Sequence, residues 1–248
     1  MRSQKMNNPS YLIPDWGLPP TIHAAMTLRQ GGVSSAPYTS LNPATHVNDA
    51  LEDVILNRNR IKTLLNLPSE PIWLNQTHGT QVIDAGAIDL NPNADASFTA
   101  IKNKVCAVLT ADCLPILLCS NEGHKIAAIH AGWRGLLAGI IEKTLDSMQT
   151  TQVSVWLGAA IGPCCFEVGL DVYTLFVAKN KQFSSAFTRK SSQKYLADIY
   201  QLARIDLALK GVNAIDGGHF CTVCDSTRFY SYRRDQQTGR MATLIWKD

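Results

Sequence analysis

One apolar run constrains the fold of this chain more than any other segment. It spans residues 105–119 and is interrupted by residues that are polar or break strands, namely Thr110, Asp112 and Pro115. A run this short and this interrupted does not cross a bilayer, so it belongs inside a globule. It predicts a buried strand over 105–110, a break at 111–115 and a second buried strand over 116–119. Cys113 therefore lies in the break between two core strands.

Short β-rich runs and helical patterns follow one another along the rest of the chain. Their composition predicts strands over 21–27, 72–75, 81–84, 125–130, 153–157, 212–215, 229–232 and 242–246. Apolar residues at helical spacing predict helices over 51–65, capped by Asn48 or Asp49, and over 136–145, 167–179 and 195–210. Because the two kinds of element do not alternate strictly, we expect an α+β fold in which central mixed β-sheets are flanked by helices.

The length and composition predict one domain. A chain of 248 residues, 46% of them apolar, can be organised by a single core, and no compositional break divides it. We therefore expect a single domain over residues 1–248. The first twenty residues contain four prolines, at positions 9, 14, 19 and 20, which predict an extended N-terminal arm over 1–20.

Charge and cysteine content narrow the partners and the compartment. The net charge of +3 comes without a run of lysines or arginines, so we expect no nucleic-acid partner, whereas a small anionic substrate would explain the slight excess. The polar N-terminus lacks the apolar core of a secretory signal. No membrane span is predicted. Seven cysteines, an odd number in a chain of this size, indicate reduced thiols and a cytoplasmic protein.

Three residues with metal-ligating side chains each end a β-rich run beside turn-forming residues: His78, Cys113 and His130. Two imidazoles and a thiolate suit Zn²⁺, and three protein ligands leave a fourth position for water, as in catalytic zinc sites. Their spacing forms no short metal motif, so a buried histidine and an inert core cysteine remain alternatives. A further alternative is a Cys/His hydrolase in which Cys113 is the nucleophile, with Asp112 or Asn75 orienting a histidine.

Two segments are candidates for binding an anion. Arg134 lies between glycines at the predicted start of a helix, where backbone amides and a guanidinium converge. A loop rich in glycine and serine extends from Arg29 to Asn42, and its backbone amides can approach an anion closely. The alternatives are that Arg134 pairs with a surface acid and that the loop is a flexible turn.

The remaining cysteines and basic residues receive structural interpretations. Cys221 and Cys224 have the spacing of a metal knuckle, but no second pair is evident, so a four-cysteine zinc site is not predicted. Cys164 and Cys165 stand at a predicted helix start, and we expect them to pack. The run 231–235 contains two arginines and is too short for a nucleic-acid patch, so it is expected to be solvated or salt-bridged.

Several motifs agree in order along nearly the whole chain. They are Arg29-Gln-Gly-Gly-Val-Ser34, Asn75-Gln-Thr-His-Gly79, Thr110-Ala-Asp-Cys-Leu-Pro115, Ile129-His-Ala-Gly-Trp-Arg-Gly135, Ile161-Gly-Pro-Cys-Cys-Phe-Glu-Val-Gly169, Phe229-Tyr-Ser-Tyr-Arg-Arg-Asp235 and Thr238-Gly-Arg240. With them the chain resembles the laccase-domain family of purine nucleoside phosphorylases, formerly labelled polyphenol oxidases. The resemblance implies Zn²⁺ held by His78, Cys113 and His130. It also implies cytoplasmic, largely monomeric proteins.

The resemblance further implies phosphorolysis of adenosine, inosine, guanosine and methylthioadenosine, together with deamination of adenosine. Purine nucleoside and phosphate are then the partners. The expected catalytic residues are Cys113, Asp112 and Arg134, with Asp112 moving a proton. The expected substrate- or phosphate-binding residues are Arg29, Asn42 and Gln76, and Arg29 or Arg134 would hold the phosphate.

Two other functions stay open at this point. Some relatives are linked to editing amino acids in cell-wall precursors, which is hydrolysis using either a water at the zinc or Cys113. A non-enzymatic metal-binding module is the third reading. A multicopper oxidase is disfavoured, because the chain has six histidines in all and the other four lack paired ligand spacing: His23, His46, His124 and His219.

Overall fold

The computed structural model describes residues 10–87 and 92–248. The strands are β1 (Tyr11–Leu12), β2 (Ile22–Thr27), β3 (Val82–Asp84), β4 (Ala96–Thr99), β5 (Val105–Thr110), β6 (Leu114–Ser120), β7 (Ile126–Ala131), β8 (Val153–Leu157), β9 (Glu167–Gly169), β10 (Phe187–Arg189), β11 (Lys194–Ala197), β12 (Ile215–Gly217) and β13 (Met241–Lys247). The helices are α1 (Leu51–Leu64), α2 (Trp133–Ala138), α3 (Ile140–Met148), α4 (Leu170–Lys179), α5 (Ile199–Leu209), α6 (Tyr232–Asp235) and the 3₁₀-helix η1 (Lys181–Ala186).

The strands of the described residues assemble into three sheets. An antiparallel sheet has the order β1-β2-β13-β5, and a mixed sheet has the order β12-β8-β6-β7-β4-β3. In the mixed sheet the outer pairs β12/β8 and β3/β4 are parallel, whereas the central pairs are antiparallel. A small antiparallel sheet, β10-β11-β9, stands beside α4.

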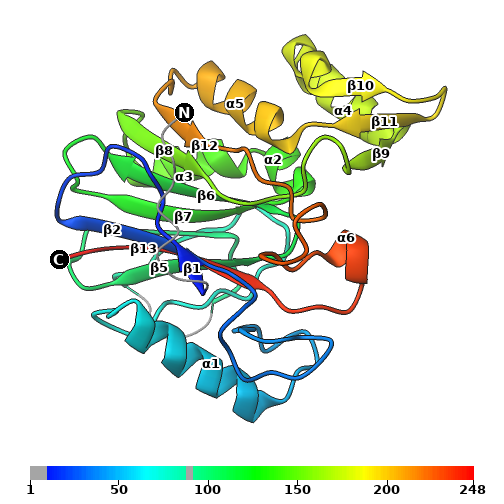
Figure 1. Ribbon diagram of the computed structural model, residues 1–248. Helices are drawn as coiled ribbons and strands as arrows, with labels where there is room; N and C mark the ends of the chain where they lie inside the picture. The colour runs from blue at the N-terminus through cyan, green and yellow to red at the C-terminus, as the bar shows by residue number, and fades with distance from the viewer. Residues whose placement is uncertain (1–9, 88–91) are drawn as a thin grey trace.

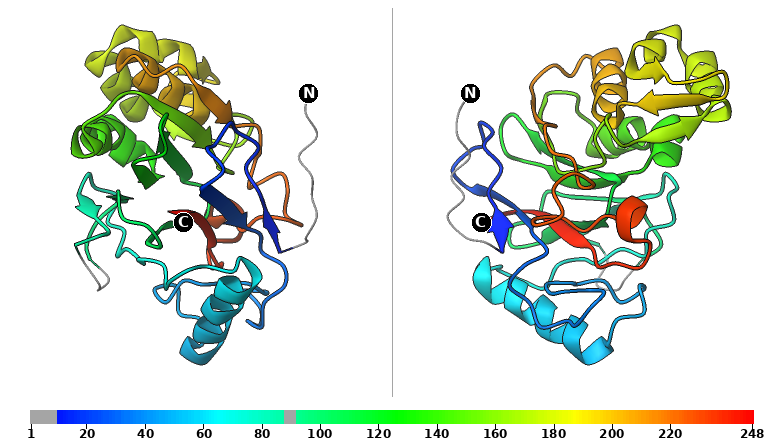
Figure 2. Two further views of the ribbon diagram at one scale, coloured as in Figure 1. Left: turned by 90° about the vertical axis from the view of Figure 1, so that its left-hand side faces the viewer. Right: turned by 45° about the vertical axis from the view of Figure 1, so that its right-hand side comes forward.

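The two large sheets and their helices are stacked in layers (Figures 1 and 2). Helix α1 covers one face of the antiparallel sheet, and the mixed sheet packs on the other face. Helices α2, α3 and α5 lie over the far face of the mixed sheet, where they share its core. The expected α+β architecture, with central mixed sheets flanked by helices, is therefore confirmed.

This layering explains why the two strands of the run 105–119 are apolar on both faces. In β5, alternate residues such as Ala107 and Val108 point to opposite sides, the first toward α1 and the second toward the mixed sheet. In β6, Leu117 faces the antiparallel sheet while Leu118 faces the helices. Both strands are buried on both faces, and each fully buried leucine contributes about 1.5–3 kcal/mol to stability.

Two predicted helices begin later than their composition indicated. Residues 167–169 and 195–197 were expected to be helical, but they belong to β9 and β11, which pair with each other. Pairing between strands outweighs the local helix propensity of their glutamate, lysine and leucine residues. Helix α5 starts only after Asp198, whose carboxylate accepts the N–H groups of Tyr200 and Gln201.

Three further local expectations are corrected. The helix predicted over 136–145 is divided into α2 and α3 at Gly139, which has a φ of 89°. The N-cap of α1 is Ala50, not Asn48 or Asp49, because the Asp49 carboxylate instead accepts hydrogen bonds from Ser34 and Asn42. Residues 229–232 are not a strand; Ser231 caps the short helix α6.

The N-terminal arm is tied to the sheet edge. Its residues 1–9 lie outside the described residues, and β1 pairs with β2. Leu12 and Trp16 are buried, so the described part of the arm is packed against the core. Among the described helices, none combines the length and apolar character needed to span a membrane.

Candidate active site

The break between β5 and β6 presents Cys113 at one end of the mixed sheet. The chain turns at Asp112, whose φ of 93° lies in the left-handed region. Because Leu114 pairs with Ala131 in the β6/β7 ladder, Cys113 comes next to the carboxyl end of β7, where His130 stands. The neighbouring Gly132 leaves room for this approach, since a Cβ there would lie 3.1 Å from the Cys113 Sγ.

Asp95 organises both histidines of the site. Its side chain is fully buried, and it accepts hydrogen bonds from the backbone N–H groups of Thr77, His78 and Gly79. These bonds fix the turn that carries His78, whose own φ is 59°. On its other side, the carboxylate lies 2.8 Å from Nδ1 of His130. One buried acid therefore positions two candidate ligands from separate segments.

The protonation of Asp95 determines which nitrogen of His130 is available. Burial alone would raise the pKa of Asp95, but hydrogen bonds from His130, Gly79 and Thr77 lower it to about 2. The carboxylate is thus ionised and only accepts, so Nδ1 of His130 carries the proton that it donates. Nε2 is left to face Cys113. Metal-binding histidines usually have this arrangement, with the second ring nitrogen held by a carboxylate.

His78, Cys113 and His130 form a group able to hold a metal ion. Their ligand atoms all lie within 4.8 Å of one another, and Nε2 of His78 is 3.8 Å from Sγ of Cys113. Burial opposes ionisation of Cys113, yet the charges and hydrogen bonds of the histidines lower its pKa to about 6. The pKa of His130 is raised, against burial, by Cys113 and Asp95. A thiolate and two imidazoles suit zinc or copper.

A cavity of about 420 Å³ opens beside this group. Its aromatic and aliphatic walls include Leu109, Trp133, Ile161, Phe166, Ile199 and Tyr232. Three arginines also line it: Arg134, Arg233 and Arg240. The guanidinium of Arg134 lies 4.3 Å from the Trp133 ring centroid. Flat apolar walls beside several cations suit a ligand that combines an aromatic ring with an anionic group.

The structure brings together six of the eight residues singled out from the sequence. His78, Cys113, His130, Asp112, Arg134 and Gln76 all line the cavity. The Gln76 amide is paired with the backbone N–H and C=O of Leu109. The Asp112 carboxylate accepts hydrogen bonds from the Thr222 hydroxyl and the Arg233 backbone N–H.

Arg29 and Asn42 are not among the cavity-lining residues. Arg29 donates to the backbone carbonyls of Thr39 and Ser226, and it lies over the ring of Tyr230. Asn42 is fully buried, and its Oδ1 accepts the backbone N–H of Arg240. Both therefore connect the N-terminal loop to the C-terminal segment that supplies one wall of the cavity.

Sequence reasoning missed four residues of the site: Asp95, His46, Arg233 and Arg240. The two arginines fall within motifs of the resemblance, but the run 231–235 was expected to be solvated or salt-bridged. Arg234 is indeed salt-bridged to Asp235 at 2.7 Å, and the exposed Arg233 also lines the cavity and donates to the backbone carbonyls of Cys165 and Glu167. Nothing local marks Asp95, because its partners lie at positions 77–79 and 130.

Comparisons with known proteins show which family the chain is similar to. The family model described as multi-copper polyphenol oxidoreductase laccase matches residues 23–248. The protein named purine nucleoside phosphorylase PA4543 of Pseudomonas aeruginosa is 47% identical over 96% of this chain and 98% of its own. Purine nucleoside phosphorylase YfiH of Escherichia coli is 47% identical over 95% of this chain and 98% of its own.

Solved structures share the fold. Protein NMB0706 of Neisseria meningitidis superposes with a TM-score of 0.93 at 44% identity, covering 96% of this chain and 99% of its own. YlmD of Geobacillus stearothermophilus superposes with a TM-score of 0.90 at 29% identity, covering 98% of each chain. With a family model matching nearly the whole length and relatives this similar, the chain belongs to the laccase-domain family, formerly called polyphenol oxidases, in which relatives are named purine nucleoside phosphorylases.

Proposed function

We propose that this protein is a zinc-dependent purine nucleoside phosphorylase. It would convert adenosine, inosine, guanosine or methylthioadenosine, with phosphate, to the free base and ribose 1-phosphate, and would also deaminate adenosine. The observation that carries the proposal is the cavity in which three arginines and several aromatic rings meet a His/Cys/His group. The names of the relatives support the same reaction class.

Zinc is the ion that the donor set and its surroundings favour. Two histidines, one of them held by a buried carboxylate, and one thiolate leave a position open for substrate or water. Bound zinc supplies a Lewis acid at that position. A multicopper oxidase would need several copper centres. In the described part of the chain, one group that includes histidine could hold a metal.

The arginines supply what phosphorolysis requires of the chain itself. A phosphate oxygen must form a bond to C1′ while the bond from C1′ to the base nitrogen breaks. Arg134, Arg233 and Arg240 would hold the phosphate dianion by charge-assisted hydrogen bonds. Trp133 and Phe166 offer flat surfaces for the base. Asp112 is the proposed proton carrier for deamination, and its bond to the Arg233 N–H also fixes that arginine's backbone.

The alternative is a hydrolase that edits amino acids in cell-wall precursors with Cys113 as nucleophile. The close approach of His78 Nε2 to the Cys113 sulfur supports this alternative, because a neighbouring histidine activates a cysteine as a nucleophile. A thiolate that ligates a metal does not attack a substrate at the same time. Metal content and nucleophilic reactivity of Cys113 therefore separate the two functions.

The deciding experiment uses purified protein of known zinc content. It is incubated with inosine and with adenosine, with and without phosphate, and the products are resolved by chromatography. Release of base only when phosphate is present supports the phosphorylase. Release without phosphate identifies a nucleoside hydrolase instead. No release from fully zinc-loaded protein contradicts the proposal and favours the cell-wall hydrolase.

We further infer a cytoplasmic protein that acts as a monomer. All seven cysteines are free, as expected in a reducing compartment. The monomeric state is the one that the family resemblance implies. Sedimentation at working concentration tests the monomer, and a dimer at that concentration would contradict it.

A further inference from the structure

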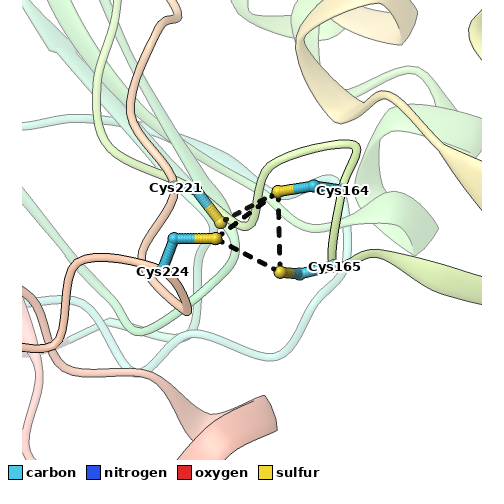
Figure 3. Close-up of side chains that lie close together, drawn as sticks. All are labelled: Cys164, Cys165, Cys221 and Cys224. Carbon is cyan, nitrogen blue, oxygen red and sulfur yellow. Dashed lines mark hydrogen bonds between the residues drawn. The ribbon is translucent and has the colours of Figure 1, made fainter.

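Four partly or fully exposed cysteines that are not members of the His/Cys/His group meet in a second cluster. Cys164 and Cys165 follow β8 and precede β9, whereas Cys221 and Cys224 follow β12 (Figure 3). Their sulfur atoms converge although the two pairs are far apart in sequence. The Sγ atom of Cys164 lies 3.6 Å from that of Cys165, 3.8 Å from that of Cys221 and 3.5 Å from that of Cys224. The pair Cys165 and Cys224 is 3.5 Å apart.

The second pair that seemed missing from the sequence is therefore present. A Cys-x-x-Cys knuckle usually meets another knuckle, but here its partner is a pair of adjacent cysteines, and Cys164 precedes Cys221 by 57 residues. Packing alone, as expected for Cys164 and Cys165, does not explain why all four sulfurs point toward one centre. Cys164 and Cys224 are also exposed, which leaves the centre open to solvent.

The distances between the sulfur atoms fit four thiolates around one zinc ion and exclude a disulfide bond. Four thiolates around one Zn²⁺ at about 2.3 Å form a tetrahedron whose edges measure about 3.8 Å. The sulfur–sulfur distances of 3.5–3.8 Å are close to that edge. A disulfide would require about 2.05 Å. A multinuclear iron–sulfur cluster spreads its metal atoms and would hold the cysteine sulfurs farther apart than a single ion does.

The backbone around the cluster is shaped to hold thiolates. The N–H of Gly162 donates to the Cys221 sulfur at 3.2 Å. A side chain at position 162 would clash, because a Cβ there would lie 2.9 Å from the Cβ of Cys221. Tight turns place the ligands, with Cys165 N–H bonded to the Gly162 carbonyl and Asp225 N–H bonded to the Cys221 carbonyl. Four thiolates this close repel one another unless a cation lies between them.

We propose that Cys164, Cys165, Cys221 and Cys224 bind a second zinc ion, in a closed tetrathiolate site that joins two loops of the fold. A site with four protein ligands has no open position, so this ion is structural. The inference does not depend on the reaction proposed above, because none of the four cysteines lines the cavity.

The second zinc would stabilise one wall of the cavity. Thr222 lies between two of the ligands, and its hydroxyl donates to Asp112 at 2.6 Å. Arg233 donates to the carbonyl of a third ligand, Cys165, at 3.1 Å. Joining these loops with a metal fixes both contacts at once. The site therefore acts as a positioning element for Asp112 and Arg233.

Metal stoichiometry tests the proposal. Purified protein, prepared under reducing conditions with zinc, is dialysed, and zinc per chain is measured by mass spectrometry. We expect two zinc ions in the unaltered protein and one in Cys113→Ala. X-ray absorption of Cys113→Ala should then show only sulfur around the zinc, at about 2.3 Å. The double variant C221S/C224S should retain one zinc with mixed nitrogen and sulfur neighbours. Cys119→Ala removes a buried cysteine outside both groups and should retain two.

The thermal unfolding temperature of the variants is a second test of the proposed zinc site. Removing a cross-link that closes a long loop should lower the Tm of C221S/C224S by about 10 °C relative to Cys119→Ala. If the double variant fails to fold, the zinc content per chain and the X-ray absorption spectrum of Cys113→Ala still test the second site. One zinc in the unaltered protein that disappears entirely in Cys113→Ala overturns the second site. Iron bound in place of zinc would also overturn the second site. So would disulfides among the four cysteines, detected as thiols that react with an alkylating reagent only after reduction. Loss of phosphorolysis with two zinc ions bound would contradict only the proposed function.

Discussion

The fully buried carboxylate of Asp95 lies 2.8 Å from Nδ1 of His130 and accepts a hydrogen bond from its N–H. The same carboxylate accepts the backbone N–H of His78. A single side chain therefore sets the position of one histidine and the tautomer of the other. Much of the predicted behaviour of the site depends on this relationship.

Replacing Asp95 with Asn should weaken metal binding without removing a ligand. An Asn side chain has one oxygen that accepts and one NH₂ that only donates. Its NH₂ would face either the backbone N–H groups of residues 77–79 or the N–H of His130, so at least one pair of donors would repel. We expect zinc affinity to fall about 10- to 100-fold, measured by competition with a chelator. Asp216→Asn, at an exposed position of β12, is the control and should bind zinc normally. Equal affinity in both variants would show that Asp95 does not act on the ligands.

Gly132→Ala tests the close packing of the ligands. Gly132 has ordinary extended dihedral angles, so alanine adds no backbone strain there. Its Cβ would lie 3.1 Å from the Cys113 sulfur and 3.2 Å from the His78 ring. We expect at least a tenfold loss of zinc affinity, because the ligands must separate. Gly17→Ala meets no atom within 4 Å and should behave as the unaltered protein does. Unchanged affinity in Gly132→Ala would contradict the ligand assignment.

Cys113→Ala separates the metal-ligand role from the nucleophile role. If Cys113 binds zinc, the substitution should abolish activity and remove the zinc of the His/Cys/His group together. If Cys113 is a nucleophile, activity should disappear while that zinc is retained. Zinc content and phosphorolysis are measured on the same preparation. Metal analysis of the protein as purified identifies the resident ion, and copper found there in place of zinc would count against zinc.

The metal-ligand candidates could be predicted because each lies where a strand meets turn-forming residues. His130 is the penultimate residue of β7, Cys113 precedes β6, and the turn of His78 precedes β3. The apolar run at 105–119 also gave both of its strands, because burial on two faces leaves a continuous apolar signal. These features depend on local sequence, which a single chain displays directly.

The missed features depend on contacts between distant segments. Strand β9 has local helix propensity, and only its pairing with β11 makes it a strand. Arg240 reaches the cavity because β13 pairs with β5 and carries the C-terminal segment to the site. The cysteine pairs meet because β12 lies beside β8. No residue near these positions announces the partner, so sequence spacing alone did not indicate them.

Arg134→Ala tests the phosphate site. Losing a charge-assisted hydrogen bond of about 1.5–3 kcal/mol should raise the KM for phosphate about 10- to 150-fold. Deamination of adenosine, which consumes no phosphate, should change much less. Arg189→Ala, on β10 and outside the cavity, serves as the control and should leave both reactions intact. If the KM for the nucleoside rises instead, Arg134 contacts the base or ribose and not the phosphate.

Asp206 gives a stability prediction that is independent of the site. It is buried in α5, its Oδ2 has no hydrogen-bond partner among the described residues, and Lys179 lies 3.8 Å from its Oδ1. Burial raises the pKa of Asp206, with Lys179 opposing this only in part. A carboxyl with a raised pKa in the folded state destabilises the fold when ionised. That cost is therefore present at neutral pH and disappears as pH falls through the folded pKa to the unfolded value.

Asp206→Asn should therefore raise the Tm at pH 7, and its advantage should shrink as pH is lowered toward 4. The comparison is made by thermal unfolding across that range. Asp146→Asn, an exposed position on α3, is the control and should show no such convergence. If Asp206→Asn is less stable at pH 7, the ion pair with Lys179 outweighs burial, and the sign of the pKa shift must be reversed. In that case the Tm of the unaltered protein would rise above that of Asp206→Asn as the pH approaches neutrality. Measuring the Tm of both proteins against pH therefore decides between burial and the ion pair.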